Sequence, residues 1–260
     1  MYEEWFQSMA DDEDMPAPNE INAVKDYIND KISANEAAVR CTSRIALEPN
    51  PDPTLLWSLF ESVAVELPGT QDKVVELLAA IKKLPDPIRN GQEHRINGQK
   101  TFSELAYFAA DFSDYWAGLR DSLRRAPDDP MGPEKWARIN AFSARLTRKF
   151  VQDFRVKAIE SIEDALEEKY LNDGKAREFF LSAAANQFIH GATALWNLGN
   201  DPGAVPRSGP FPSWIVWRAG FEIQSERDDV PAETKALLKL ALEAMNSVAE
   251  EPEKRIWSLA

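Results

Sequence analysis

The residues of this sequence most suited to chemistry lie in one segment, residues 179–200, which contains no Asp, Glu, Lys or Arg. At about 100° per residue, a helix would place its uncharged polar side chains on a common side. These side chains are Ser182, Asn186, His190, Thr193 and Asn197. His190 could act as an acid or base near neutral pH, with Asn186 and Asn197 orienting it or a ligand. We therefore take His190 as the candidate catalytic residue; a histidine paired within the core is the structural alternative.

The opposite side of this segment carries an apolar stripe, formed by Leu181, Ala184, Phe188, Ala192 and Leu195. Because a surface helix normally carries charged residues, an uncharged helix is expected to be enclosed on nearly all sides. Its buried polar groups would then need partners, which could be neighbouring helices, ordered water or a bound small molecule. The segment is about long enough to span a bilayer, but its Asn, Gln and His residues argue against a membrane location.

Several tryptophans and one arginine are candidates for binding a ligand beside this segment. The tryptophans could line a pocket, although aromatic residues at helical spacing more often form a core. Arg145 lies between Phe142 and Leu146 and could turn inward to pair with a carboxylate or an anionic ligand, although a surface arginine is the common alternative. The candidate ligand-binding residues are Trp136, Asn140, Arg145, Asn186, Trp196, Asn197, Trp214 and Trp217.

Other chemistries lack their residues. The two histidines, His94 and His190, do not form a Glu-x-x-His pair, so a di-iron site has no ligand set. The single cysteine, Cys41, has no assigned base and is interpreted as a small buried thiol. The run Glu163, Asp164, Glu167 and Glu168 is interpreted as a solvated helix face. No Walker loop, dinucleotide fingerprint or Gly-x-Ser-x-Gly elbow is present, and we expect neither a metal nor a cofactor.

Charge and composition restrict the classes of partner. The net charge is −13 and the pI is near 4.8, which argues against binding a nucleic-acid backbone or an anionic membrane surface. The first residues lack the basic and apolar regions of a secretory signal, and one cysteine excludes an internal disulfide framework. A cytoplasmic protein is therefore expected.

The spacing of apolar residues predicts helices along nearly the whole chain. Residues 19–47 and 134–172 are each expected to form one helix, although a break near Thr147 is the alternative for the second. Asn97-Gly98 is a strong turn pair, so at most one small β-hairpin is expected. We predict a flexible acidic N-terminus, residues 1–18, and a single all-α, bundle-like domain, residues 19–260. It would contain about nine helices, with the uncharged helix at its centre.

Two stretches together resemble a large fungal family known only as a domain of unknown function. They are LLWSLFESVAVELPGTQDKVVELLAAIKKLP, residues 55–85, and WARINAFSARL, residues 136–146. Later elements agree with it, namely ATALWNL, Ser208-Gly209-Pro210, Trp214 to Trp217 and a closing helix with Met245. The resemblance covers roughly residues 50–250 and implies a fungal, intracellular, helical protein. It implies no catalytic residues.

Two classes of function follow from these residues. The first is a protein that binds a hydrophobic or aromatic small molecule, including a cofactor-independent enzyme of the cyclase or isomerase type in specialised metabolism. The second is a non-enzymatic adaptor with a fully packed core, which binds another protein or a second copy of itself. A cavity of several hundred Å³ that touches His190 would favour the first class, and a dry core with internally paired polar groups would favour the second.

Overall fold

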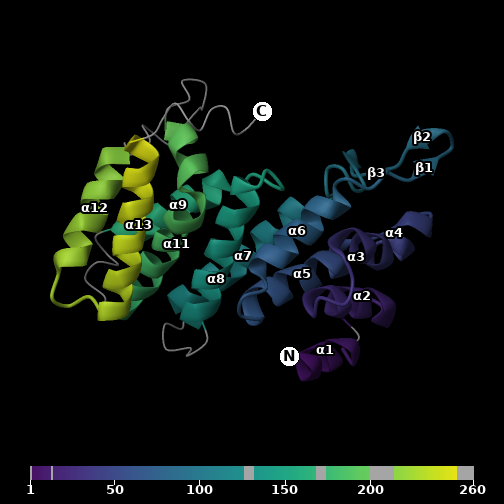
Figure 1. Ribbon diagram of the computed structural model, residues 1–260, viewed down its shortest axis with the longest axis horizontal. Helices are drawn as coiled ribbons and strands as arrows, with labels where there is room; N and C mark the ends of the chain where they lie inside the picture. Colours follow the sequence, from purple (N-terminus) through teal and green to yellow (C-terminus); the bar gives the residue numbers. More distant parts are fainter. Residues whose placement is uncertain (1, 13, 126–131, 168–173, 200–213, 251–260) are drawn as a thin grey trace. The chain divides into compact units, whose positions relative to one another are not determined.

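The computed structural model describes residues 2–12, 14–125, 132–167, 174–199 and 214–250, where the chain is mainly helical (Figure 1). These residues contain twelve helices and two small antiparallel strand pairs. The mainly helical class is therefore confirmed, whereas the expected count of about nine helices is too low. The count differs because the two long helices expected over residues 19–47 and 134–172 are both interrupted, and because a further helix, α1, lies within the first eighteen residues.

The chain divides into two compact units, Met1–Gly118 and Leu119–Ala260, which we call unit 1 and unit 2. The boundary falls within helix α7 (Phe108–Arg125). That residues 19–260 form a single domain therefore remains a prediction from the sequence.

Unit 1 is built on an aromatic core. Its helices before α7 are α1 (Glu3–Ala10), α2 (Pro18–Ile28), α3 (Ala34–Cys41), α4 (Ser43–Leu47), α5 (Thr54–Glu66) and α6 (Gln71–Ile81). Trp57 on α5 is fully buried, and its Nε1 donates to the carbonyl oxygen of Ala106 at 2.8 Å. Its ring lies 5.8 Å from that of Phe60 and 5.7 Å from that of Phe108, between centroids. Burial of these rings is a large part of what stabilises unit 1.

The first eighteen residues, which the sequence predicts to be flexible, contain helix α1. The ring of Phe6 is buried, and Trp5 Nε1 donates to Glu66 Oε2 on α5 at 2.9 Å. The Tyr2 hydroxyl donates to the carbonyl oxygen of Pro68 at 2.5 Å. These contacts attach α1 to α5 and to the loop that follows α5.

Two β-hairpins follow α6, where the sequence predicts at most one. Asn97-Gly98 connects β3 (Arg95–Ile96) and β4 (Gln99–Lys100) as expected. Asn90-Gly91 connects β1 (Ile88–Arg89) and β2 (Gln92–Glu93) in the same way. All four turn residues have positive φ, between 51° and 84°, as a type I′ turn requires. The upper limit of one hairpin was wrong because both Asn-Gly pairs adopt this turn.

Unit 2 is arranged around its longest helix. Its helices after α7 are α8 (Gly132–Arg148), α9 (Arg155–Leu166), α11 (Gly174–Gly199), α12 (Trp214–Glu226) and α13 (Ala232–Glu250). α11 contacts α8, α9 and α13, and α12 packs beside α13 (Figure 1). The uncharged segment is only part of a helix, since α11 begins before it and its first turns contain the charged residues Lys175, Arg177 and Glu178. The buried Arg177 pairs with Asp229 Oδ2 at 3.0 Å.

The helix expected over residues 134–172 is divided into α8 and α9. Phe150 has a φ of 56°, the left-handed conformation that ends many helices. The N–H of Phe150 donates to the carbonyl oxygen of Thr147, and the N–H of Val151 to that of Leu146, which together form a Schellman motif. The Thr147 hydroxyl also accepts a hydrogen bond from the N–H of Phe154 at 3.0 Å. The sequence hides this end because a phenylalanine occupies the position where glycine is usual.

The acidic run of α9 is not entirely a solvated face, which corrects the interpretation from sequence. The side chain of Asp164 is only 1% exposed and accepts hydrogen bonds from two arginines of α7. Arg120 binds it in bidentate fashion at 2.6 Å through Nε and Nη2, and Arg124 Nη2 adds a contact at 2.7 Å. Glu163 and Glu167 are exposed, as expected. These charge-assisted bonds connect the unit 2 part of α7 to α9.

We predict that Asp164→Asn lowers the free energy of unfolding by about 3 kcal/mol, because a buried ion pair loses its anion. This loss of stability is at the low end of what is expected for breaking a buried ion pair, because Arg120 and Arg124 are both partly exposed. Urea denaturation would measure the change, with Asp153→Asn as the control. Asp153 pairs with Arg155 on the surface, where loss of a pair costs at most about 1 kcal/mol. Equal losses in the two variants would contradict this role of Asp164.

Candidate functional site

The two faces of α11 differ in burial in a way the sequence predicts only in part. Every residue of the predicted apolar stripe is buried, at 7% exposure or less. The opposite stripe is half-buried rather than enclosed, as seen at Ser182, Asn186, His190 and Thr193. Asn186 Nδ2 donates to the carbonyl oxygen of Ser182 at 2.8 Å, within its own helix. The side chain of Asn197 lies outside the described residues.

The buried polar groups of α11 are concentrated at Gln187 instead. Its Nε2 donates to Asn140 Oδ1 and to Ser143 Oγ on α8, at 2.9 Å each. The Ser161 hydroxyl of α9 donates to the same Asn140 oxygen at 2.5 Å. Asn140 Nδ2 in turn donates to the carbonyl oxygen of Trp136 at 2.8 Å. We call Asn140, Ser143, Ser161 and Gln187 the polar cluster.

Small residues allow the close helix approach that the polar cluster needs. Gly191 lies one turn after Gln187, and a Cβ atom placed there would be 3.2 Å from the Cβ of Ala144. That distance is tighter than ordinary van der Waals contact, so α11 passes α8 at a point where glycine fits best. With the two helices this close, the short Asn140 and Ser143 side chains reach the Gln187 amide. The packing of small residues thus positions the hydrogen bonds.

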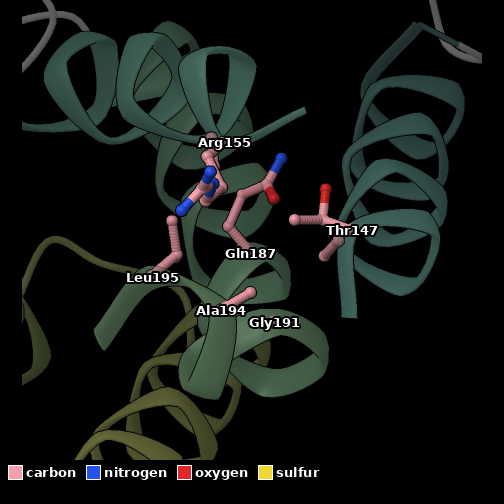
Figure 2. Close-up of a pocket in the computed structure, with 8 residues that line it drawn as sticks. Thr147, Arg155, Gln187, Gly191, Ala194 and Leu195 are labelled. Carbon is pink, nitrogen blue, oxygen red and sulfur yellow. The ribbon is translucent and has the colours of Figure 1, made fainter. Parts of the chain in front are cut away.

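A narrow space lies beside the polar cluster, between α8, α9 and α11 (Figure 2). The Gln187 side chain extends between Thr147 of α8 and Arg155 of α9. The space measures about 160 Å³, open solvent included, and no part of it is wide enough to hold a water molecule. It is lined by Ala144, Thr147, Arg155, Ala158, Gln187, Gly191, Ala194 and Leu195. This space does not have the size of a small-molecule pocket.

The structure brings three of the four candidate tryptophans together. Trp196 and Trp214 lie 5.1 Å apart edge to face, and Phe188 lies 5.4 Å from Trp214 and 5.9 Å from Trp217. Phe221 completes this aromatic cluster, 5.3 Å from Phe188. Among the described residues, the buried Nε1 atoms of Trp214 and Trp217 have no hydrogen-bond acceptor. An indole N–H without an acceptor is costly when buried.

The other candidate residues lie apart from the aromatic cluster. Trp136 is fully buried on α8, and its ring lies 6.3 Å from that of Phe180, two turns before Phe188 on α11. Arg145 is half-buried, and its Nη1 donates to the carbonyl oxygen of Ala141 at 3.2 Å. Asn140 is the candidate that joins the polar cluster.

The sequence reasoning missed Gln187, Ser143 and Ser161 as partners of Asn140. A signal for them exists in α8, where Asn140, Ser143 and Thr147 recur at spacings of three and four. This recurrence places uncharged polar groups on one face of a helix. The cluster contains no ionisable group, so it can orient helices but cannot transfer protons.

The described residues offer little for metal or thiol chemistry. Within them, no three His, Cys, Asp or Glu side chains are grouped so that they could hold a metal ion. Burial strongly raises the pKa of the Cys41 thiol, so it is not a nucleophile near neutral pH. In the same ranges, none of the helices has the length and hydrophobicity that crossing a bilayer would require.

One strongly perturbed carboxyl group lies in unit 1. Glu61 on α5 is 3% exposed, and its Oε1 atom has no hydrogen-bond partner among the described residues. Burial, and to a lesser extent the charge of Asp111, raise the pKa of Glu61 to about 9. Glu61 is therefore protonated at neutral pH. The sequence reasoning did not identify it, although its neighbours along the chain, such as Leu59, Phe60 and Val63, are mostly apolar and indicate a buried helix.

The polar cluster predicts a loss of stability when its central amide is removed. We expect Gln187→Met to lower the free energy of unfolding by about 1–3 kcal/mol, because two hydrogen bonds are lost inside the protein. Asn186→Ala is the matched control on the next residue, since Asn186 bonds only to its own helix, and about 0.5 kcal/mol or less is expected. Urea denaturation measures both. A Gln187 variant as stable as the control would show that the cluster does not stabilise unit 2.

The raised pKa of Glu61 predicts that stability falls as pH rises. The ordinary glutamate pKa is about 4.3, so between that pH and about 9 the folded state binds more protons than the unfolded state. The free energy of unfolding should then fall by up to about 1.4 kcal/mol per pH unit, and Glu61→Gln should flatten this slope. Urea denaturation from pH 5 to pH 9 tests it, with the exposed Glu36→Gln as control. If Glu61→Gln leaves the slope as steep as in the control, Glu61 ionises normally.

Comparison with known protein families identifies the family of this chain. Residues 57–230, more than half of the 260 residues, match the family described as "Protein of unknown function (DUF3632)". The matched range contains Glu61, the polar cluster and the aromatic cluster. No curated protein and no solved structure matches the chain. The chain therefore belongs to the DUF3632 family of proteins of unknown function.

Proposed function

We propose that the protein is a non-enzymatic interaction module that binds a helix of another protein on the outer face of α12. The single observation that carries this proposal is an apolar stripe exposed on that helix. Ile215 is 76% exposed, Val216 is 53% exposed and Ile223 is 61% exposed. Ala219, between them, is also exposed. We call these four residues the outer stripe.

The outer stripe is not needed for the fold of unit 2. The inner face of α12 already buries Trp217, Phe221 and Gln224. Ile215, Ala219 and Ile223 follow one another at spacings of four residues, so they form a continuous row along the helix. Three large aliphatic side chains on one short helix are more than a scattered set of exposed residues, and contiguous apolar patches mark interaction sites. A partner helix with apolar residues at the same spacing would cover this row.

The charges around the outer stripe indicate the chemistry of the partner. Glu222 and Glu226 are exposed on the same side of α12, and the chain as a whole carries a net charge of −13. Arg218 is paired with Glu222 at 2.9 Å, so it neutralises only part of this charge. An amphipathic helix with lysine or arginine beside its apolar face would complement both the stripe and its rim.

The internal pairing of the polar cluster supports a non-enzymatic role. The Gln187 Nε2 group donates to Asn140 and Ser143, and the Asn140 Oδ1 atom accepts from Gln187 and Ser161, so these two groups are engaged within the protein. The narrow space beside them is too small for a water molecule. We also propose that the protein is cytoplasmic and of fungal origin.

A second candidate function rests on the aromatic cluster. The indole N–H groups of Trp214 and Trp217, which have no acceptor among the described residues, could donate to an oxygen atom of an aromatic or other hydrophobic ligand. His190, on the polar side of α11, would then be the acid or base of a cofactor-independent cyclase or isomerase. This candidate ranks second because the narrow space between α8, α9 and α11 is too small for such a ligand.

We expect a photo-crosslinking residue at position 223 to form an adduct with a basic helical segment of one partner protein in the cells that make the full chain. Ile215→Glu should reduce the amount of that adduct about tenfold or more, because a charged side chain then replaces an apolar contact with the partner. The same crosslinker at Val156, an exposed apolar residue on α9, is the matched control. Mass spectrometry identifies the crosslinked peptide.

Two results would contradict the proposal. One is the same set of adducts from positions 223 and 156, which would indicate random encounters. The other is a small molecule that co-purifies with the chain in native mass spectrometry and is lost in Trp217→Ala, which would favour the second candidate.

A further inference from the structure

A second site is formed in unit 1, where α5 and α7 meet. The Ser58 hydroxyl of α5 donates to Asp111 Oδ2 of α7 at 3.4 Å. Glu61 lies three residues after Ser58, and Tyr115 lies four residues after Asp111, so each pair shares one face of its helix. The Ser58–Asp111 contact therefore brings the helix face with Glu61 beside the face with Tyr115. Burial is the main reason why the pKa values of Glu61 and Tyr115 are raised, and the charge of Asp111 adds to the shift of Glu61, as those of Glu66 and Glu61 add to the shift of Tyr115.

The charged groups that act on this site all carry the same sign. Burial raises the pKa of Asp111, and the hydrogen bond from Ser58 lowers it. The charges of Asp114 on the same helix and of Asp52 before α5 raise it further. The charge of Glu66 at the end of α5 acts on Tyr115, together with that of Glu61. No Lys, Arg or His contributes to the electrostatics of Glu61, Asp111 or Tyr115 among the described residues. This differs from Asp164 in unit 2, which binds two arginines.

We propose that Glu61 and Asp111 bind a primary ammonium group, with the oxygen of the Tyr115 hydroxyl as a third acceptor. The buried Oε1 atom of Glu61 is an acceptor without a donor in the described chain. Asp111, Ser58 and Tyr115 are half-buried, so the site is reached from the surface. A primary ammonium carries three N–H donors on one compact charge, which matches a site with three oxygen acceptors.

An ammonium fits this site better than a divalent metal ion. The described residues contain no group of three acidic, histidine or cysteine side chains arranged for a metal. Ca²⁺ requires six or more oxygen ligands, and Mg²⁺ requires a near-ideal octahedron. Two carboxyl groups and a phenol suit a single positive charge, and their negative field would attract it. This site goes beyond the interaction function proposed for α12, since it lies on different helices and binds a different kind of group.

Binding of the ammonium would be coupled to release of a proton. At neutral pH Glu61 is protonated, because it is buried and lies beside another acid. A cation at its Oε1 favours the carboxylate, so the carboxyl proton leaves to solvent as the ammonium enters. One proton is lost for each ammonium bound. The Glu61 carboxylate and the bound ammonium then have opposite charges, so their sum is zero, as it was for the protonated carboxyl group. Affinity should therefore increase as the pH rises from 6 toward 9.

Carbon-13 NMR of the full chain labelled at glutamate carboxyls tests the proposal, with butylammonium as the probe. The Glu61 signal is assigned by its absence in Glu61→Gln. We expect its titration midpoint to lie near the value of about 9 in free protein and to fall by about one pH unit or more at saturating butylammonium. Three control probes are matched to butylammonium. Butanol has a similar chain without a charge, tetramethylammonium is a cation without N–H donors, and Mg²⁺ is a metal ion. A normal midpoint in free protein, no change with butylammonium, or an equal change with tetramethylammonium or Mg²⁺ would overturn the proposal.

Variants give an independent measure of the same site. Glu61→Gln and Asp111→Asn should each weaken butylammonium binding about tenfold or more in calorimetric titrations at pH 8, since each removes one carboxylate. Glu36→Gln, an exposed glutamate of α3, should bind butylammonium as the unaltered chain does. If Asp111→Asn does not fold, Glu61→Gln and the NMR midpoint of the unaltered chain still decide the outcome. Binding that is unchanged in Glu61→Gln would refute the assignment.

Discussion

The amide group of Gln187 is the contact on which the arrangement of unit 2 depends most. It donates from α11 to two residues of α8, and its acceptor Asn140 also receives the hydroxyl of Ser161 on α9. Buried polar groups are costly when unpaired, so a shift of any one helix along another would leave several of them without partners. The cluster therefore selects one register among the many that apolar contacts alone would allow.

This constraint also determines which surfaces remain for function. Because α8, α9 and α11 use their polar groups on one another, the described part of unit 2 offers a partner its exterior, and on α12 that exterior is apolar at Ile215 and Ile223. Unit 1 shows the opposite situation. Its core is aromatic around Trp57, yet Glu61 is buried with an oxygen that no described residue satisfies. Unit 1 has an open buried acceptor at Glu61, whereas unit 2 exposes an apolar stripe on α12, which is why we assign them different kinds of partner.

The elements that could be predicted are those whose signals are local in sequence. Apolar spacing predicts most helices, and Asn97-Gly98 predicts its hairpin because both turn residues must adopt positive φ. The start of α7 shows an error that a distant residue causes. Apolar spacing predicts a helix from Phe102 to about Arg125, but residues 102–107 are not helical, and the N–H groups of Phe102 and Ser103 donate to the distant Asp86 carboxylate. The end of α8 has a local cause instead, since a phenylalanine there adopts the conformation expected of glycine.

The candidate site shows the same division. The sequence alone determines the mainly helical class, the family, the buried apolar stripe of α11 and the absence of charge from residues 179–200. Only the tertiary structure decides that Asn140 pairs with Gln187, that Trp214 and Trp217 meet at Phe188, and that Asp164 and Glu61 are buried. The physical reason is that helical periodicity fixes which residues share a face. The burial and pKa of a side chain depend on the groups that other helices place against that face.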